Sequence, residues 1–109
     1  MALVWTPLVN SLVEIQEDLV FMISPFIQET TLKRLENICK FSKKLAVITR
    51  WNAGDIISGA SDLAIYPFLK SKGIRLYINK SIHLKLLLYS NNRALVSSGN
   101  ITDHGLGFS

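Results

Sequence analysis

The residues best suited to chemistry lie near the C-terminal end of the chain. His83 and Lys85 stand two positions apart at the start of the leucine-rich run SIHLKLLLYS, and Ser98, Gly99 and Asn100 close the run RALVSSGN. An imidazole can attack phosphorus or transfer a proton, while an ammonium and a carboxamide can hold phosphate oxygens. A glycine beside them leaves room for a ligand. These residue types together predict a site for a phosphoryl group.

A β-hairpin would bring the two groups together. The runs IHLKLLLYS and RALVSSGN are extended in pattern, and Asn91-Asn92 between them tolerates the positive φ angles of a tight turn. Side chains alternate along a strand, so His83 and Lys85 share one face. A turn at the two asparagines sets a register with three facing pairs. These are Ser90 with Arg93, Lys85 with Ser98, and His83 with Asn100.

The first half of the chain predicts helix, strand, helix and strand in succession. Thr6 before Pro7 is a typical helix start, and apolar residues at helical spacing continue to about Glu17. The run DLVFMISPF predicts a buried strand, and KKLAVITRW predicts a second one. Between them, Thr30 or Thr31 is expected to cap a helix. The apolar side of that helix consists of Leu32, Leu35, Ile38 and Cys39.

The middle of the chain continues this alternation. The stretch NAGDIISGAS is typical of a loop, and Ser61 with Asp62 predicts the start of a helix that runs through Leu69 and is kinked or divided at Pro67. Gly73 predicts its end, and IRLYIN predicts a third strand. We therefore expect one α/β domain over residues 1–109. It should have a mixed, largely parallel β-sheet flanked by helices, and a C-terminal hairpin that carries the candidate site.

Composition narrows the choice of partner. Apolar residues make up 49% of the chain and charged residues 18%, against about 25% in a typical domain. This balance favours a sheet covered on both faces or a buried partner surface. The net charge of +4 favours anionic partners, either nucleic acid or phospholipid headgroups.

The cysteine content and the length of the apolar runs indicate where in the cell the protein is located. The lone Cys39 cannot form an internal disulfide and is expected in the core, which fits a reducing cytoplasm. The longest apolar run, LVFMI, is far shorter than the roughly 20 residues of a membrane span. The sequence therefore predicts a cytoplasmic protein without a membrane span.

Two further groups of residues are candidate binding sites. Arg50 and Trp51 follow the second strand, where they would hold a phosphate or stack a base; a packed tryptophan beside a solvated arginine is the structural alternative. Asp103 and His104 would ligate a metal together with His83, but their spacing matches no known metal site. We expect no metal and no other cofactor.

The run HLKLLLYSNNRALVSSGNITDHGLG resembles the signature of the phospholipase D superfamily. That signature is a histidine, any residue, a lysine, four residues, an aspartate, six residues, two small residues, any residue and an asparagine. His83, Lys85 and Asn100 fall on its positions, and Ser97 and Ser98 form the small pair. Together with similar upstream sequence, the resemblance covers about the last two thirds of the chain.

The resemblance implies a metal-independent phosphodiesterase. His83 would form a phosphohistidine, Lys85 and Asn100 would hold the phosphate oxygens, and Ser98 would add a hydroxyl. Gly99 and Arg50 complete the expected substrate-binding set. One active site in this family needs two such motifs and the chain has one, so we expect a homodimer or a second motif in a longer parent chain. DNA is the expected substrate.

The chain departs from the family pattern at two places. Ser90 occupies the aspartate position, and the sequence stops before the asparagine and glutamate that usually follow GLGFS. We therefore expect the N-terminal part of a longer domain or protein, weak or inactive alone. Two alternatives stay open: a lipid phosphodiesterase of the same superfamily, and a non-catalytic module for nucleic-acid binding or dimerisation.

Overall fold

The computed structural model describes residues 18–39, 41–90, 94–96 and 100–102. The helix expected over residues 7–17 lies outside these ranges. The described elements, in chain order, are β1 (Leu19–Ser24), α2 (Glu29–Cys39), β2 (Ala46–Thr49), α3 (Ala53–Ile57), α4 (Ile65–Ser71), β3 (Arg75–Ile78), β4 (Leu86–Tyr89) and β5 (Ala94–Val96).

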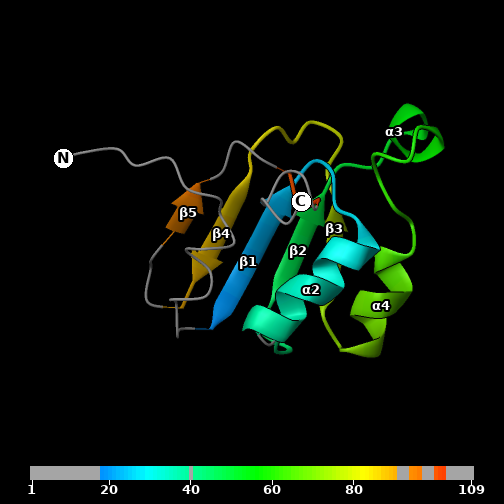
Figure 1. Cartoon of the computed structure of the whole chain (residues 1–109). Helices are drawn as coiled ribbons and strands as arrows, with labels where there is room; N and C mark the ends of the chain where they lie inside the picture. The colour runs from blue at the N-terminus through cyan, green and yellow to red at the C-terminus, as the bar shows by residue number, and fades with distance from the viewer. Residues whose placement is uncertain (1–17, 40, 91–93, 97–99, 103–109) are drawn as a thin grey trace.

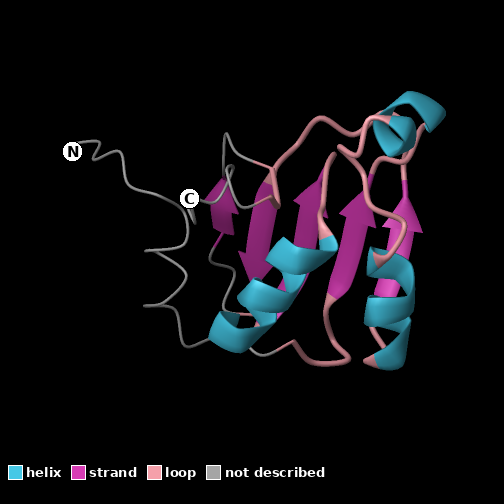
Figure 2. Cartoon of the chain, turned by 45° about the vertical axis from the view of Figure 1, so that its right-hand side comes forward, coloured by secondary structure: helices cyan, strands magenta, loops and turns pink. Residues whose placement is uncertain are grey.

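The five strands form one mixed sheet in the order β3-β2-β1-β4-β5 (Figure 1). Strands β1, β2 and β3 are parallel, whereas β4 runs antiparallel to β1 and β5 antiparallel to β4. Helices α2 and α4 lie on the same face of the sheet, and α3 lies beyond the ends of the parallel strands (Figure 2). This confirms the predicted α/β fold with a mixed sheet and helical connections.

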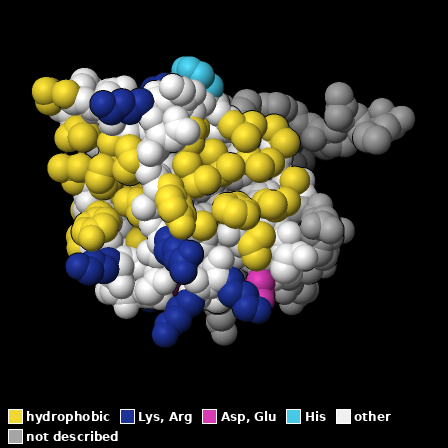
Figure 3. Space-filling view, turned by 180° about the vertical axis from the view of Figure 1, so that it is seen from behind, with side chains coloured by type: hydrophobic (Ala, Val, Ile, Leu, Met, Phe, Trp, Pro, Cys, Tyr) yellow, Lys and Arg dark blue, Asp and Glu magenta, His cyan; other side chains and the backbone are white. Residues whose placement is uncertain are grey.

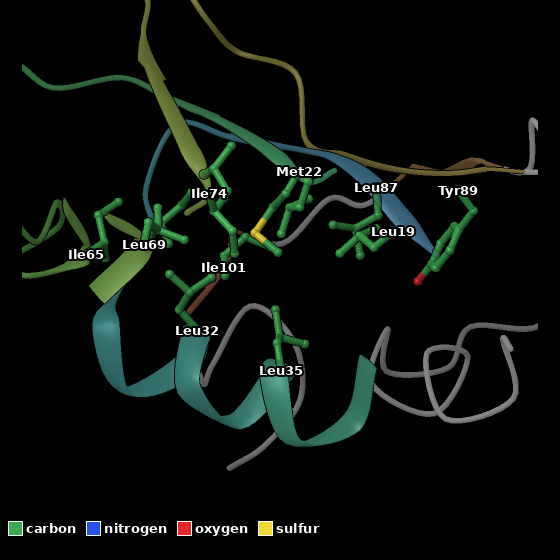
Figure 4. Packing of buried hydrophobic residues seen from close by; sticks show 13 residues of the cluster. Leu19, Met22, Leu32, Leu35, Ile65, Leu69, Ile74, Leu87, Tyr89 and Ile101 are labelled. Atoms are coloured by element: carbon green, nitrogen blue, oxygen red, sulfur yellow. The ribbon is translucent and has the colours of Figure 1, made fainter. Parts of the chain in front are cut away.

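The core lies between the sheet and helices α2 and α4 (Figure 4). Strands β2 and β4, and β1 from Phe21 onward, alternate buried and less buried residues, as the period of a strand requires, so one face supplies the core. The sheet contributes Met22, Val47, Leu87 and Tyr89, and the helices contribute Leu32, Leu35, Ile65 and Leu69. Cys39 packs against this cluster, and burial raises the pKa of its thiol.

The start of α2 differs from the prediction. The helix begins at Glu29, so Thr30 and Thr31 lie inside its first turn, and Thr31 is buried. The Glu29 amide donates to Asp62 Oδ2 at 3.1 Å. A carboxylate from the loop before α4 therefore accepts a hydrogen bond from an amide in the first turn of α2. A threonine hydroxyl of the segment itself was expected to do this.

The stretch 52–61 is not wholly a loop. Residues 53–57 form the short helix α3, and the side chain of Asn52 accepts a hydrogen bond from the Asp55 amide at 3.0 Å. Asparagine is a favoured N-cap residue, so Asn52, which was predicted to belong to a loop, marks the start of a helix.

Pro67 neither kinks nor divides α4. The helix begins at Ile65, so Pro67 occupies its first turn, where a backbone N–H has no intrahelical partner. The expected start at Ser61 and Asp62 is wrong: the N-cap is Ala64, which makes no side-chain capping bond, and Asp62 Oδ1 accepts from the Ala64 amide at 3.0 Å in the turn before the helix. Gly73 ends the helix as predicted, with φ +72° and the Ile74 amide donating to the Leu69 carbonyl at 3.0 Å.

The C-terminal hairpin exists, but its register and length differ from the prediction. Leu88 pairs with Ala94 and Leu86 with Val96, which shifts every pair by one residue from the register set by a two-residue turn. Strand β4 also begins only at Leu86, so His83 and Lys85 precede it. The consecutive leucines place apolar side chains on both faces, so they carry little information about the partner opposite each one.

Candidate active site

The strands direct the candidate residues to one edge of the sheet, here called the carboxyl edge. Parallel strands β1, β2 and β3 all end there, and the antiparallel β4 begins there. In open α/β sheets, ligands bind in crevices beyond the carboxyl ends of the strands. The segment that carries His83 and Lys85 connects β3 to β4 along this edge.

Lys85 and Ser24 lie just beyond the last pair of the β1–β4 ladder. The last pair of the β1–β4 ladder at this end is Ile23 with Leu86, so Ser24 and Lys85 are the next residues outward on their strands. Met22 and Leu87 pair one step inward and both are buried on the helix-covered face. Alternation along β1 assigns Ser24 to that same face, whereas Lys85 comes just before β4.

His83 is exposed and Lys85 is half-buried. The segment before them is tied to the edge by Asn79, whose amide donates to the Thr49 carbonyl at 2.9 Å and whose Oδ1 accepts from the Ser81 amide at 2.9 Å. The imidazole is thus open to solvent on a backbone that is anchored four residues earlier.

Asn100 is fixed at the same edge by contacts with the end of β1. Its Oδ1 lies 3.3 Å from the Ser24 hydroxyl and accepts from the Phe26 amide at 3.3 Å. Both contacts use the carboxamide oxygen. Among the described residues, the amide nitrogen of Asn100 has no hydrogen-bond partner, so its two N–H donors are available for an anion.

The neighbouring backbone holds Asn100 in place. The Ile101 amide donates to the Phe26 carbonyl at 3.1 Å and approaches Ser24 Oγ at 3.2 Å, while the Gln28 amide donates to the Ile101 carbonyl at 3.0 Å. Ile101 itself is buried and forms a parallel bridge with Ile27. The chain after the hairpin is therefore joined to the connection between β1 and α2.

The structure places Lys85 and Asn100 at the same edge of the sheet, but not through the pairing that was predicted. The sequence placed them near each other through pairing within the hairpin, with His83 opposite Asn100. With the observed register that pairing is wrong, and Asn100 contacts Ser24 at the end of β1 instead. Ser98 and Gly99 lie outside the described residues.

Arg50 lies at the carboxyl edge but is held inward. Its Nε is 3.4 Å from Asp55 Oδ2, and its guanidinium stands 5.0 Å from the centre of the Phe26 ring. The arginine side chain is 17% exposed, so it is not the solvated residue of the structural alternative. Trp51 packs against the core, as that alternative expected. Most of the charge of Arg50 is matched by Asp55.

Lys85 differs from Arg50 in this respect. Within the described part of the chain, no carboxylate forms an ion pair with Lys85, whereas Arg50 has Asp55. A lysine without a described carboxylate partner, at the same edge as a carboxamide with free donors, makes this edge attractive to an anion.

Ser24 is the site residue that the sequence analysis missed. It is fully buried, yet it is polar and ends an otherwise apolar strand. The signal was present in MISPF, where a serine before a proline closes the run of apolar residues. A polar residue at the end of a buried strand is often kept for a hydrogen bond.

The described residues contain no group of three or more histidine, cysteine, aspartate or glutamate side chains placed to hold a metal ion. Asp103 and His104 lie outside the described ranges. Within those ranges, no helix is long and apolar enough to cross a bilayer.

Comparison of the chain with protein-family models, with curated proteins and with solved structures finds no match.

Proposed function

We propose that the chain is a phospholipase D-like domain of a cytoplasmic, metal-independent phosphodiesterase that cleaves DNA through a phosphohistidine at His83. The observation that carries the proposal is the position of Asn100 at the carboxyl edge, where its Oδ1 contacts Ser24, with His83 and Lys85 on the segment that enters β4 at the same edge. The unused amide donors of Asn100 and the unmatched charge of Lys85 suit the oxygens of a phosphodiester. The net charge of +4 suits a polyanionic substrate.

The proposed reaction has two displacements. In the first, a nitrogen of His83 attacks phosphorus, a P–N bond forms, the P–O bond to one sugar breaks, and the leaving oxygen takes a proton. In the second, water attacks the phosphohistidine, the P–N bond breaks, and the histidine returns as the leaving group. Lys85 and Asn100 would stabilise the charge that builds on the phosphoryl oxygens in both steps.

The proton for the leaving oxygen needs a second acidic group, since His83 is occupied as the nucleophile. A second copy of the chain, related by a twofold axis, would supply its own His83 for this step. The pair would then have one nucleophile and one acid in each reaction.

The test is hydrolysis of plasmid DNA and of a chromogenic phosphodiester in excess EDTA, comparing the native chain with His83→Ala. Activity should persist in EDTA and fall by at least about a thousandfold in the variant, because the nucleophile is gone. Ser81→Ala is the matched control, since Ser81 is exposed on the same segment and its hydrogen bond to Asn79 Oδ1 uses the backbone amide. A trapped, acid-labile phosphoenzyme would identify the intermediate.

Three results would contradict the proposal. Activity that EDTA abolishes would indicate a metal mechanism, and activity that survives His83→Ala would indicate another nucleophile. Salt-sensitive DNA binding that tolerates His83→Ala, without turnover, would indicate a binding module.

A further inference from the structure

One face of the sheet carries none of the described helices. Helices α2 and α4 both pack on the opposite face (Figures 1 and 2). We call the uncovered side the open face, and Figure 3 shows hydrophobic side chains spread across it. Pairing between the parallel strands places two rows of side chains there. The first row is Phe21, Ala46 and Arg75, and the second is Ile23, Ile48 and Tyr77.

A hollow lies over the smallest side chain of the first row. Ala46 stands between Phe21 and Arg75, so larger side chains rise on both sides of it. The hollow has a volume of about 620 Å³, and its lining includes Phe21 and Tyr77. These two residues are 40% and 48% exposed. Exposed aromatic rings on the face of a sheet are platforms on which unpaired nucleic-acid bases stack.

Three cations border this hollow at the amino ends of the parallel strands. They are Lys43, Lys44 and Arg75, here called the cationic rim. Among the described residues none of the three has an ion-pair partner, whereas Lys72 on the helix-covered side pairs with Glu36 at 2.9 Å. Asp18 comes just before β1 at the same end, so positive charge still exceeds negative charge there. The charges and the rings together suit a partner that carries both anionic and flat apolar groups.

A single strand of nucleic acid has both kinds of group. Each nucleotide brings one phosphate for a lysine or arginine and one base that is free to stack on a ring. A duplex has the same phosphates, but its bases are stacked on one another inside the helix. It could therefore contact the cationic rim without using Phe21 or Tyr77.

The open face also leads to the candidate active site. In Figure 3 the described histidine stands at the upper border of this face, and a group of lysine and arginine side chains stands at the lower border. The four residues of β2 extend about 13 Å between the two ends. A strand that is held at the cationic rim would therefore reach His83 within a few nucleotides.

We propose that the open face binds single-stranded nucleic acid, with bases stacked on Phe21 and Tyr77 and phosphates on the cationic rim, along a path that leads to His83. This inference rests on the proposed function for cleavage at His83, and it names the class of substrate. Binding needs no reaction, so the two proposals can fail separately.

Binding is tested by fluorescence anisotropy with a labelled oligothymidine of about 12 nucleotides, using His83→Ala in EDTA so that the probe stays intact. The single strand should bind at least about tenfold more tightly than a duplex of equal length. Lys44→Gln and Arg75→Gln should each weaken binding by about threefold or more and reduce its dependence on salt. Lys33→Gln is the matched control, since Lys33 is an exposed lysine of α2 on the opposite face. Equal affinity for the duplex, or an equal loss in the control, would overturn the proposal.

The stacking platform is tested by photo-cross-linking with an oligonucleotide that contains 5-iodouracil. Cross-links should form to peptides that contain Phe21 or Tyr77. Tyr77→Leu should reduce both cross-linking and affinity, because it keeps an apolar side chain but removes the ring. Tyr66→Leu is the control, since Tyr66 is 50% exposed on α4 and should not contact the strand. Cross-links confined to α2 or α4 would contradict the placement on the open face.

Cleavage assays separate this inference from the proposed function. The native chain in EDTA should cut single-stranded circular DNA faster than duplex plasmid. Binding as expected without any cleavage would support the open face as a binding surface and contradict the proposed function. Cleavage that depends on His83 but is unchanged in Arg75→Gln and Tyr77→Leu would overturn the open face as the binding surface. Rim-dependent binding to vesicles of phosphatidylserine and phosphatidylcholine, without oligonucleotide binding, would overturn it in favour of a membrane surface.

Discussion

Ser24 joins two segments that lie far apart in the sequence, the end of β1 and the residues after the hairpin. Its hydroxyl is 2.9 Å from the Phe26 carbonyl and 3.3 Å from Asn100 Oδ1, and the Ile101 amide approaches it at 3.2 Å. A hydroxyl has one proton, so the shorter contact to Phe26 is the stronger candidate for its donated bond. Its lone pairs then serve Ile101. One buried side chain thus sets the position of the residues that follow the hairpin.

Ser24→Ala should destabilise the fold by about 1–3 kcal/mol, because the Ile101 amide is left buried with a weaker set of partners. The measurement is urea unfolding. Ser42→Ala is the control: Ser42 Oγ accepts from the Lys44 amide at 3.2 Å in an exposed turn, and its loss should cost less than about 0.5 kcal/mol. Equal costs for the two variants would show that Ser24 is not a structural centre.

At the scale of elements, much of the fold follows from local pattern. Strands β1, β2 and β3 and the stop at Gly73 were predictable, because apolar runs and a glycine with positive φ are local signals. The start of α2 was not, since the group that serves its first amide is Asp62, which lies in another loop. No local pattern reports a partner that only the tertiary fold supplies.

The candidate site also has features that local sequence predicts and features that depend on the tertiary fold. The residue types and spacing of His83, Lys85 and Asn100 were sufficient to predict a shared edge of the sheet. The hairpin register was predicted wrongly because a run of leucines accepts neighbouring registers equally well. Ser24 depends on pairing between β1 and β4, which are distant in sequence.

Gly73→Ala should destabilise the chain by about 1–2 kcal/mol. The residue has φ +72°, and a Cβ there would meet Lys43 Cγ at 3.3 Å, so backbone strain and contact act together. Gly54→Ala is the matched control in α3, where a Cβ would meet only Asn52 Oδ1 at 3.8 Å. It should be neutral or stabilising, since alanine favours helix. Thermal unfolding distinguishes the two, and an equal loss in both would contradict the assignment of strain to Gly73.

At the scale of the whole molecule, the strands of the sheet differ in how well their backbone amides are protected from hydrogen exchange. Strand β1 is central and pairs on both sides, whereas β3 and the three-residue β5 each pair on one side among the described strands. Backbone amides of β1 are therefore held by the largest cooperative unit of the fold.

Native-state hydrogen exchange should show this gradient. The amides of Met22 and Ile23 should exchange slowest, and those of Ala94 to Val96 at least about tenfold faster, because an edge strand opens without the rest of the sheet. Protection of β5 equal to that of β1 would contradict the gradient and indicate that another strand covers this edge.

The pairing of β1 with β4 also has a consequence for biosynthesis. As the chain leaves the ribosome, β1 emerges early, and α2, β2, α3, α4 and β3 must all follow before β4 can pair with it. Until then one side of the central strand has unpaired backbone groups and exposed apolar side chains, a state prone to association with other nascent chains. Because this pair closes a long loop, it should form late. The carboxyl edge, which needs both strands, is then among the last parts of the molecule to be completed.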